Sequence, residues 1–157
     1  ALDKLGIAHE VVPGVSSFLA AAAAMQKEYT LPEVTQTVIL TRMEGRTPVP
    51  ERERIEELAK HRATMVIFLS VGRIAELAER LKTAYPETTP VAVVYKASWP
   101  DETIVTGTLA DIAEKVQAAG ITKTALVTIG DFLGDSYALS KLYDKAFTHE
   151  YRQGKNA

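Results

Sequence analysis

Few residues of this sequence have the types and spacing of catalytic groups. The three histidines, His9, His61 and His149, are scattered, so no pair at helical spacing predicts a metal site. No serine lies in a Gly-x-Ser-x-Gly turn, and the sequence has neither a Walker loop nor a Gly-x-Gly-x-x-Gly motif. Cysteine is absent, which excludes a thiolate nucleophile, a cysteine-bound zinc and a disulfide. The sequence therefore predicts no metal and names no catalytic residue.

Small and polar residues instead follow four apolar runs. They are found at residues 15–17, 69–72, 96–99 and 129–131. In an open α/β sheet, ligands bind beyond the carboxyl ends of parallel strands, where small residues let a ligand approach the backbone. Ordinary turn chemistry needs the same Gly, Ser and Asp residues as caps, and on these residues alone it is the favoured explanation.

The elements that would position these residues follow from the hydrophobic pattern. Apolar, largely β-branched runs at 37–40, 65–69, 91–95 and 125–129 predict strands buried on both faces, and helical spacing between them predicts helices over 55–59, 74–81 and 109–116. Residues 102–108 follow the third run too closely for a helical crossover, so they should pair antiparallel. We expect an α/β fold with a mixed, mainly parallel sheet flanked by helices.

Three further elements are expected outside this core. Residues 7–12 have the pattern of a short strand, and a helix over 18–29 begins after Ser16 or Ser17 as its N-cap. Apolar residues at helical spacing predict a last helix over 137–151. The first six residues resemble a final helical turn that ends at Gly6, so we expect the chain to be cut from a longer protein.

Composition limits the partners and the compartment. The 157 residues are 46% hydrophobic and 24% charged, the balance of a chain that folds into a globular core. The net charge of -2 gives no global positive field for nucleic acid or anionic lipid, and the longest apolar stretch is far short of the ~20 residues that cross a bilayer. We expect a soluble protein without nucleic-acid or membrane partners, and the lack of cysteine fits the cytoplasm.

Four stretches together resemble the tetrapyrrole methylase family. These stretches are residues 11–17, 66–70, 90–95 and 106–109. Two more, residues 41–50 and 96–102, are similar to the branch of the family that methylates precorrin-4, with or without cobalt, at ring carbon 11 in cobalamin synthesis. The resemblance runs from Gly6 to about Phe147. It implies S-adenosylmethionine as methyl donor and a tetrapyrrole (precorrin) as substrate.

The resemblance also implies how the chain is organised. Family members have two α/β domains with the donor between them and work as homodimers. Residues 1–34 would then be the end of the first domain, and residues 35–157 would form the second domain. The upstream loops of the first domain lie outside this sequence, so the fragment alone is expected to be inactive.

The resemblance assigns roles to seven residues. Ser16 and Ser17 would face the donor's amino-acid or adenosine portion, Leu69 would pack against the donor, and Ala97 would let the backbone reach the adenine. Core packing for Leu69 and helix capping for Ser16 are the alternatives. Arg42, Arg46 and Lys96 are candidates to pair with the carboxylates of the tetrapyrrole.

Two other functions stay open at this point. The donor motifs are shared across the family, so methylation at another corrinoid position is one alternative. The chain would otherwise be a dimerisation or ligand-binding module without activity of its own.

Overall fold

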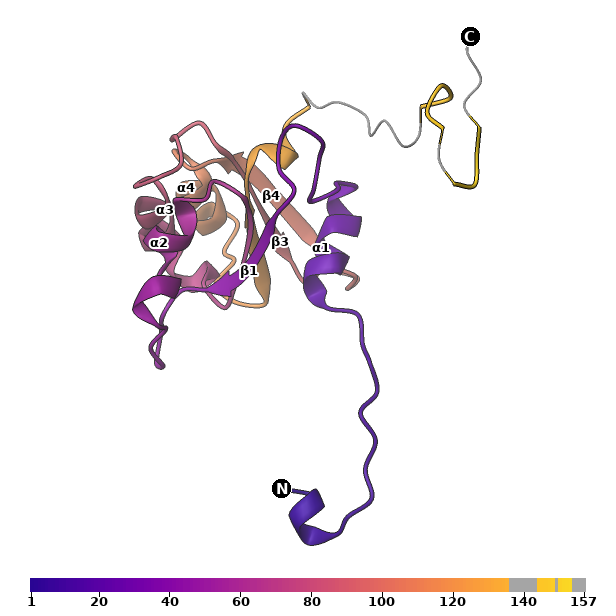
Figure 1. The fold of residues 1–157 in the computed structure, drawn as a ribbon. Coiled ribbons are helices and arrows are strands. Elements are labelled where there is room, and N and C mark those ends of the chain that lie inside the picture. The colour runs from indigo at the N-terminus through magenta and orange to yellow at the C-terminus, as the bar shows by residue number, and fades with distance from the viewer. Residues whose placement is uncertain (136–143, 149, 154–157) are drawn as a thin grey trace.

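A computed structural model describes residues 1–135, 144–148 and 150–153 and contains one five-stranded sheet (Figure 1). Its strands are β1 (Val38–Arg42), β2 (Thr64–Phe68), β3 (Pro90–Tyr95), β4 (Thr103–Thr108) and β5 (Ala125–Ile129). The helices are α1 (Ser17–Met25), α2 (Ile55–Ala59), α3 (Ile74–Leu81) and α4 (Ile112–Ala118). Each expected strand of the sheet and each expected helix between the strands is present, with ends that differ by a few residues.

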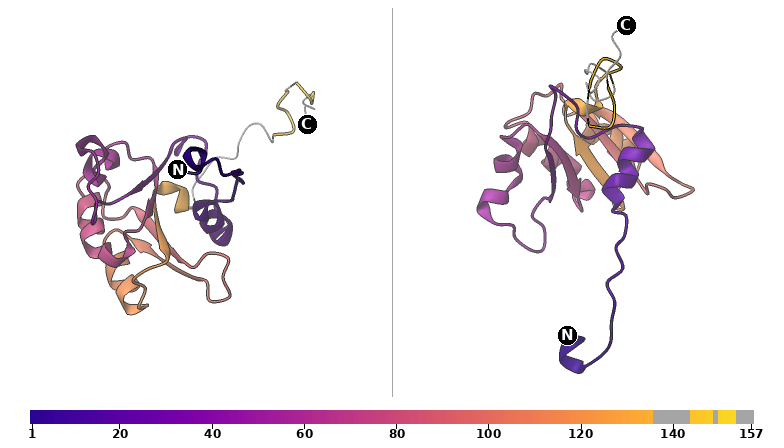
Figure 2. Two further views of the ribbon diagram at one scale, coloured as in Figure 1. Left: turned by 90° about the horizontal axis from the view of Figure 1, so that it is seen from below. Right: turned by 45° about the vertical axis from the view of Figure 1, so that its right-hand side comes forward.

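Helices cover both faces of the sheet. On one face, Met65, Ile67 and Val93 pack with α2, α3 and α4 in the larger core. On the other face, Val66 and Val94 pack with α1 and with Phe132. Because alternate residues of a strand point to opposite faces, this division explains why the strands are apolar throughout. Figure 2 shows α1 on the side of the sheet opposite the other three helices.

Hydrogen bonds of the segment after α1 fix that helix on the sheet. The Tyr29 hydroxyl donates to the Phe18 carbonyl at 2.7 Å, and the Thr64 hydroxyl at the start of β2 donates to the Tyr29 carbonyl at 2.8 Å. The Tyr29 ring also makes an edge contact with Phe132 at 5.2 Å between centroids. Burial raises the pKa of the Tyr29 phenol to about 12, so it stays a donor at neutral pH. These contacts hold the first turn of α1 against the sheet.

The α/β class and the mixed sheet are confirmed, but the expected predominance of parallel pairing is wrong. The strand order is β1-β2-β5-β3-β4, and of the four neighbouring pairs only β1 and β2 are parallel. The hairpin after β3 reverses the chain as expected, so β4 is antiparallel to β3. Helix α4 then carries the chain past β3, and β5 inserts between β2 and β3 in the direction of β4. The crossover therefore yields no parallel neighbour.

Residues 7–12 do not form the expected strand, because an extended segment becomes a strand only by pairing. These residues are exposed, and they run away from the sheet beneath α1 (Figure 1). Val11 and Val12 are 86% and 75% exposed, respectively. Residues 7–12 thus have the apolar pattern of a strand, but no strand among the described residues pairs with them.

Most of the helix expected over 137–151 lies outside the described residues. Residues 144–148 are turn and irregular structure. Within the described part of the chain, no helix is long and apolar enough to cross a membrane.

Candidate functional site

A pocket of about 530 Å³ opens where β2 and β3 end and β5 begins. Three of the four residues assigned to the methyl donor line it: Ser17, Leu69 and Ala97. Lys96, a substrate candidate, lines it as well. Val94 and Leu126 lie at its base, and Trp99 lies at its rim. Segments far apart in the sequence thus meet in one hollow of the size that binds small molecules.

Leu69 does not pack in the core, because its side chain is 88% exposed. Its backbone has a φ of 56°, a left-handed conformation that costs an ordinary residue about 1–2 kcal/mol. Lys96 and Thr124, which line the same pocket, and Ser98, in the turn beside it, also have positive φ values, of 46°, 56° and 71°. Backbone strain of this kind gathers at ligand sites, where the surrounding structure maintains it.

The turn between β3 and β4, residues 96–102, is held by its own side chains. Lys96 forms an ion pair with Asp101, and its ammonium lies 5.0 Å and 5.4 Å from the ring centroids of Tyr95 and Trp99. The ion pair raises the pKa of the Lys96 ammonium and lowers the pKa of the Asp101 carboxyl. Glu102 accepts the Ser98 N–H at 2.6 Å. Lys96 is therefore already paired in this turn.

Helix α1 begins at the pocket. Ser16 occupies the N-cap position, with extended backbone angles, but its hydroxyl makes no capping hydrogen bond. Ser17 lines the pocket, whereas Ser16 precedes it on the exposed approach to the helix. The first turn of a helix carries free N–H groups and a partial positive charge, which favour an electron-rich ligand group.

Arg42 and Arg46 belong to a neighbouring loop that follows β1. The Arg42 guanidinium donates to the Thr47 and Pro48 carbonyls at 3.2 Å and 3.1 Å and to the Thr47 hydroxyl at 3.0 Å. It thereby shapes the loop over 43–48 and does not line the pocket. Arg46 is exposed on this loop. Neither arginine lines the pocket with the residues assigned to the methyl donor.

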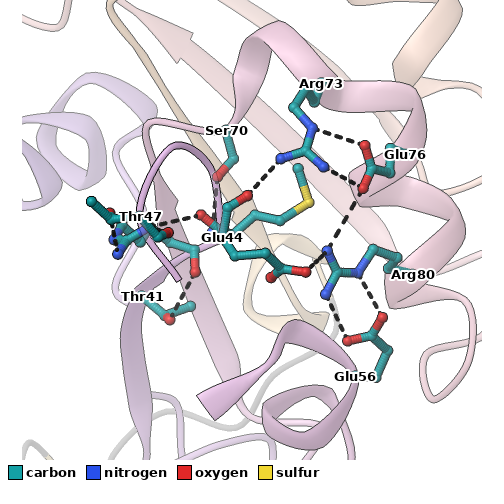
Figure 3. A network of polar contacts seen from close by, with 10 residues as sticks. Thr41, Glu44, Thr47, Glu56, Ser70, Arg73, Glu76 and Arg80 are labelled. Atoms are coloured by element: carbon teal, nitrogen blue, oxygen red, sulfur yellow. Dashed lines mark hydrogen bonds and ion pairs between the residues drawn. The ribbon is translucent and has the colours of Figure 1, made fainter. Parts of the chain in front are cut away.

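A network of charged side chains fixes this loop to α3 (Figure 3). Arg80 contacts Glu44 at 2.6 Å and Glu56 at 2.6 Å, and Arg73 donates to the Glu44 carbonyl at 2.5 Å. Hydrogen bonds from Arg80 lower the pKa of both the Glu44 and the Glu56 carboxyl. The Ser70 hydroxyl, just beyond β2, accepts the Met43 N–H at 3.0 Å. The loop after β1 is thus tied to the segment that carries Leu69.

The end of β5 does not lie at the pocket, contrary to expectation. Ile129 pairs with Met65 and with Val91, near the starts of β2 and β3. Because β5 is antiparallel to both neighbours, residues 129–131 lie at the opposite edge of the sheet, and residues 122–125 line the pocket instead. Sequence reasoning missed this segment because no local signal gives the direction of β5, and it also missed Arg73, which directly follows the expected residues 69–72.

Among the described residues, no cluster of three or more metal-ligating side chains is found. The site offers apolar surface, backbone N–H groups and fixed cations, but no acid–base pair within the pocket lining. Such an arrangement can bind and orient a ligand and exclude water from it.

Comparison with known proteins places this chain in a family. The sequence model of the tetrapyrrole (corrin/porphyrin) methylases matches residues 1–113. The chain belongs to this family. Among tetrapyrrole methylases, it is 59% identical over 97% of its length to the cobalt-precorrin-4 C(11)-methyltransferase of Methanocaldococcus jannaschii. It is 47% identical over 98% of its length to the precorrin-4 C(11)-methyltransferase of Pseudomonas aeruginosa.

Solved structures of tetrapyrrole methylases agree with this assignment. The X-ray structure of the cobalt precorrin-4 methyltransferase CbiF matches 84% of this chain, with a TM-score of 0.81 and 48% identity. A uroporphyrin-III C-methyltransferase from Thermus thermophilus, complexed with S-adenosyl homocysteine, matches 85% of it with a TM-score of 0.67 and 26% identity. The chain spans 60% and 62% of the length of the two curated relatives and 56% of the CbiF chain.

Proposed function

We propose that this chain is part of an S-adenosylmethionine-dependent methyltransferase that methylates precorrin-4 or cobalt-precorrin-4 at ring carbon 11 in cobalamin biosynthesis. The observation that carries the proposal is the single pocket in which Ser17, Leu69 and Ala97 meet. These are residues that the family resemblance assigns to the methyl donor. The identity of 59% to a relative named for this reaction supports the choice of substrate.

The pocket suits one end of the donor. Leu69, Val94 and Leu126 offer an apolar wall for a nucleoside, and Ala97 leaves room for a flat base beside the backbone. Ser17, in the first turn of α1, presents a hydroxyl and a backbone N–H to a ribose or a carboxylate. The donor supplies a methyl group from a sulfonium: the S–CH3 bond breaks as the bond to the ring carbon forms, and the sulfur departs as a neutral thioether. The residues of this chain would orient that group and exclude water from it.

The substrate would bind beside the pocket, toward the loop after β1. Arg46 is exposed there and is available for a carboxylate of the tetrapyrrole. Arg42 would act indirectly, because its guanidinium holds the loop that carries Arg46. Lys96, which is paired with Asp101, would have to exchange that partner to bind substrate.

The rest of the enzyme would complete the site. We propose that residues 1–34 end a first α/β domain, that residues 35–157 form the second, and that the donor lies between them. The whole protein would be a cytoplasmic homodimer. The exposed Val11 and Val12 would be covered by the rest of the first domain. The chain spans only 60% of the length of its relative from Methanocaldococcus jannaschii, so the relative has further residues that could form such a domain.

Calorimetric titration with S-adenosylhomocysteine tests this proposal. The protein extended at its N-terminus to the length of its relatives should bind the ligand, whereas the 157-residue chain should bind it much more weakly. The variant Ala97→Phe, which fills the base position, should weaken binding in the extended protein without lowering its melting temperature. If the extended protein does not bind the ligand, the methyltransferase proposal is wrong.

The position of methylation needs a separate assay. The extended protein should convert precorrin-4 or cobalt-precorrin-4, with labelled methyl carbon, to a product that carries the label at ring carbon 11. A label at another ring carbon would keep the enzyme class and change the assignment within it.

A further inference from the structure

The rim of the pocket carries an indole whose role is not yet explained. Trp99 lines the pocket and is 57% exposed, although large aromatic side chains are usually covered. It is the only tryptophan of the 157 residues. Leu69, on the segment after β2, is 88% exposed and lines the same pocket. Two large apolar side chains thus border this hollow without packing into the core.

The turn that carries Trp99 is rigid. The backbone N–H of Trp99 donates to the Lys96 carbonyl at 2.9 Å, and the backbone N–H of Glu102 donates to the Trp99 carbonyl at 3.0 Å. The Lys96 N–H donates in turn to the Thr124 carbonyl at 2.9 Å, which ties the turn to the segment before β5. The ion pair between Lys96 and Asp101 also joins the first half of the turn to the second. The backbone that carries the indole is therefore already ordered, which lowers the entropy cost of a contact with a ligand.

The groups around the Trp99 ring indicate which kind of ligand would bind there. The Lys96 ammonium lies 5.4 Å from the Trp99 ring centroid, so a cation already lies over one face. With the ring 57% exposed, much of the remaining surface is open. A flat, uncharged aromatic group stacks well on such a surface, whereas a second cation would be repelled by Lys96.

We propose that Trp99 is a binding residue for the methyl donor and that it stacks against the donor's purine. The inference rests on the proposed function, since it adds a residue to the same site. Trp99 is two residues from Ala97, and both line the pocket. The loop with Arg46 follows β1, three strands away from β3 in the sheet. Trp99 is thus placed at the purine end of the pocket and away from the proposed substrate loop.

The test compares variants of the N-terminally extended protein by calorimetry with S-adenosylhomocysteine. Trp99→Ala should weaken binding about tenfold, the size of one base–aromatic stacking contact. Trp99→Leu, which keeps bulk without an aromatic face, should lose a similar factor, and Trp99→Phe should stay within about threefold of the parent. Ile104→Ala, an exposed apolar residue of β4 outside this pocket, serves as the matched control and should bind normally.

Steady-state kinetics separate stacking on the donor from other roles. Trp99→Ala should raise the KM for S-adenosylmethionine and leave the KM for the tetrapyrrole unchanged. Normal donor affinity of both Trp99→Ala and Trp99→Leu would overturn the inference, and so would a raised KM for the tetrapyrrole alone. If the parent protein binds no S-adenosylhomocysteine, it is the proposed function that fails. Circular dichroism of Trp99→Leu and Trp99→Phe establishes that the comparison is made on folded protein.

Discussion

Replacing Arg80 by methionine removes the guanidinium at the centre of the charged network and keeps much of its aliphatic stem. The Arg80 side chain is only 14% exposed, and it bonds Glu56 through Nε at 2.6 Å and through Nη2 at 2.9 Å. Its Nη1 contacts Glu44 Oε1 at 2.6 Å, while Glu44 Oε2 is buried without a hydrogen-bond partner in the described part of the chain. The variant would leave the Glu44 and Glu56 carboxylates without the cation that they share.

The expected loss follows from these contacts. A hydrogen bond to a charged group contributes about 1.5–3 kcal/mol, and removal of one partner of a buried pair costs about 3–5 kcal/mol. The Glu44 and Glu56 side chains are 28% and 33% exposed, so water can replace part of what Arg80 supplies. We therefore expect Arg80→Met to lower the free energy of unfolding by about 2 kcal/mol at pH 7, or the melting temperature by about 4–8 °C.

Urea unfolding followed by circular dichroism measures this loss. Arg52→Met is the matched control, because the Arg52 side chain is 86% exposed and its removal should change the free energy of unfolding by less than about 0.5 kcal/mol. A change for Arg80→Met as small as that of the control would refute the reasoning.

The same pair of proteins gives a pH test. Arg80 holds the pKa of the Glu44 and Glu56 carboxyls below 4.5 in the folded state. A lowered pKa contributes stability that is fully present above the unfolded value and is lost as the pH falls through the folded value. The stability difference between parent and Arg80→Met should therefore be constant from pH 7 to about pH 5 and shrink below it. A difference that does not change with pH would mean that packing, not charge, stabilises the loop.

Three further substitutions test single features of the fold. Leu69→Gly should raise the free energy of unfolding by about 1 kcal/mol, because it relieves a left-handed backbone at an exposed residue, and it should lower the affinity for the donor. Thermal melts measure the first effect and calorimetry the second, and a lower melting temperature would contradict the strain. Gly130→Ala should destabilise by about 1–3 kcal/mol, because φ is 140°, a backbone conformation that L side chains rarely adopt; an unchanged urea midpoint would argue against it. Tyr85→Phe should cost about 1–2 kcal/mol in the same assay, because the buried hydroxyl donates to the Ala63 carbonyl at 2.5 Å, and a neutral effect would show that water replaces the bond.

Local pattern was enough to predict the strands of the sheet, the helices between them and two sides of the pocket. Strands buried on both faces are apolar throughout, and Leu69 and Ala97 follow two of them directly, so their positions at one edge came from periodicity. The sequence did not decide whether Leu69 packs in the core or contacts a ligand, because both roles need the same apolar residue. Its exposure of 88% decides against the core.

Long-range topology and side-chain pairing could not be predicted in the same way. Residues 129–131 were expected at the ligand edge because the sheet was expected to be mainly parallel. The direction of β5 depends on where α4 delivers the chain, which no local signal encodes. Arg42 and Lys96 were expected to be available for a ligand, yet the loop carbonyls and Asp101 bind them. Such partners are chosen by tertiary geometry, so composition and spacing do not reveal them.

The central place of β5 has a consequence for how the protein is made. Of the described strands, β5 comes last in the chain, yet it is the only one that joins β2 to β3. During synthesis from the N-terminus, the β1–β2 and β3–β4 ribbons leave the ribosome first, each with an open apolar edge. An open strand edge can pair with another chain, so these edges stay exposed to aggregation until residues 125–129 emerge and pair with both. A break in translation before this strand would yield two unjoined ribbons instead of a smaller folded protein.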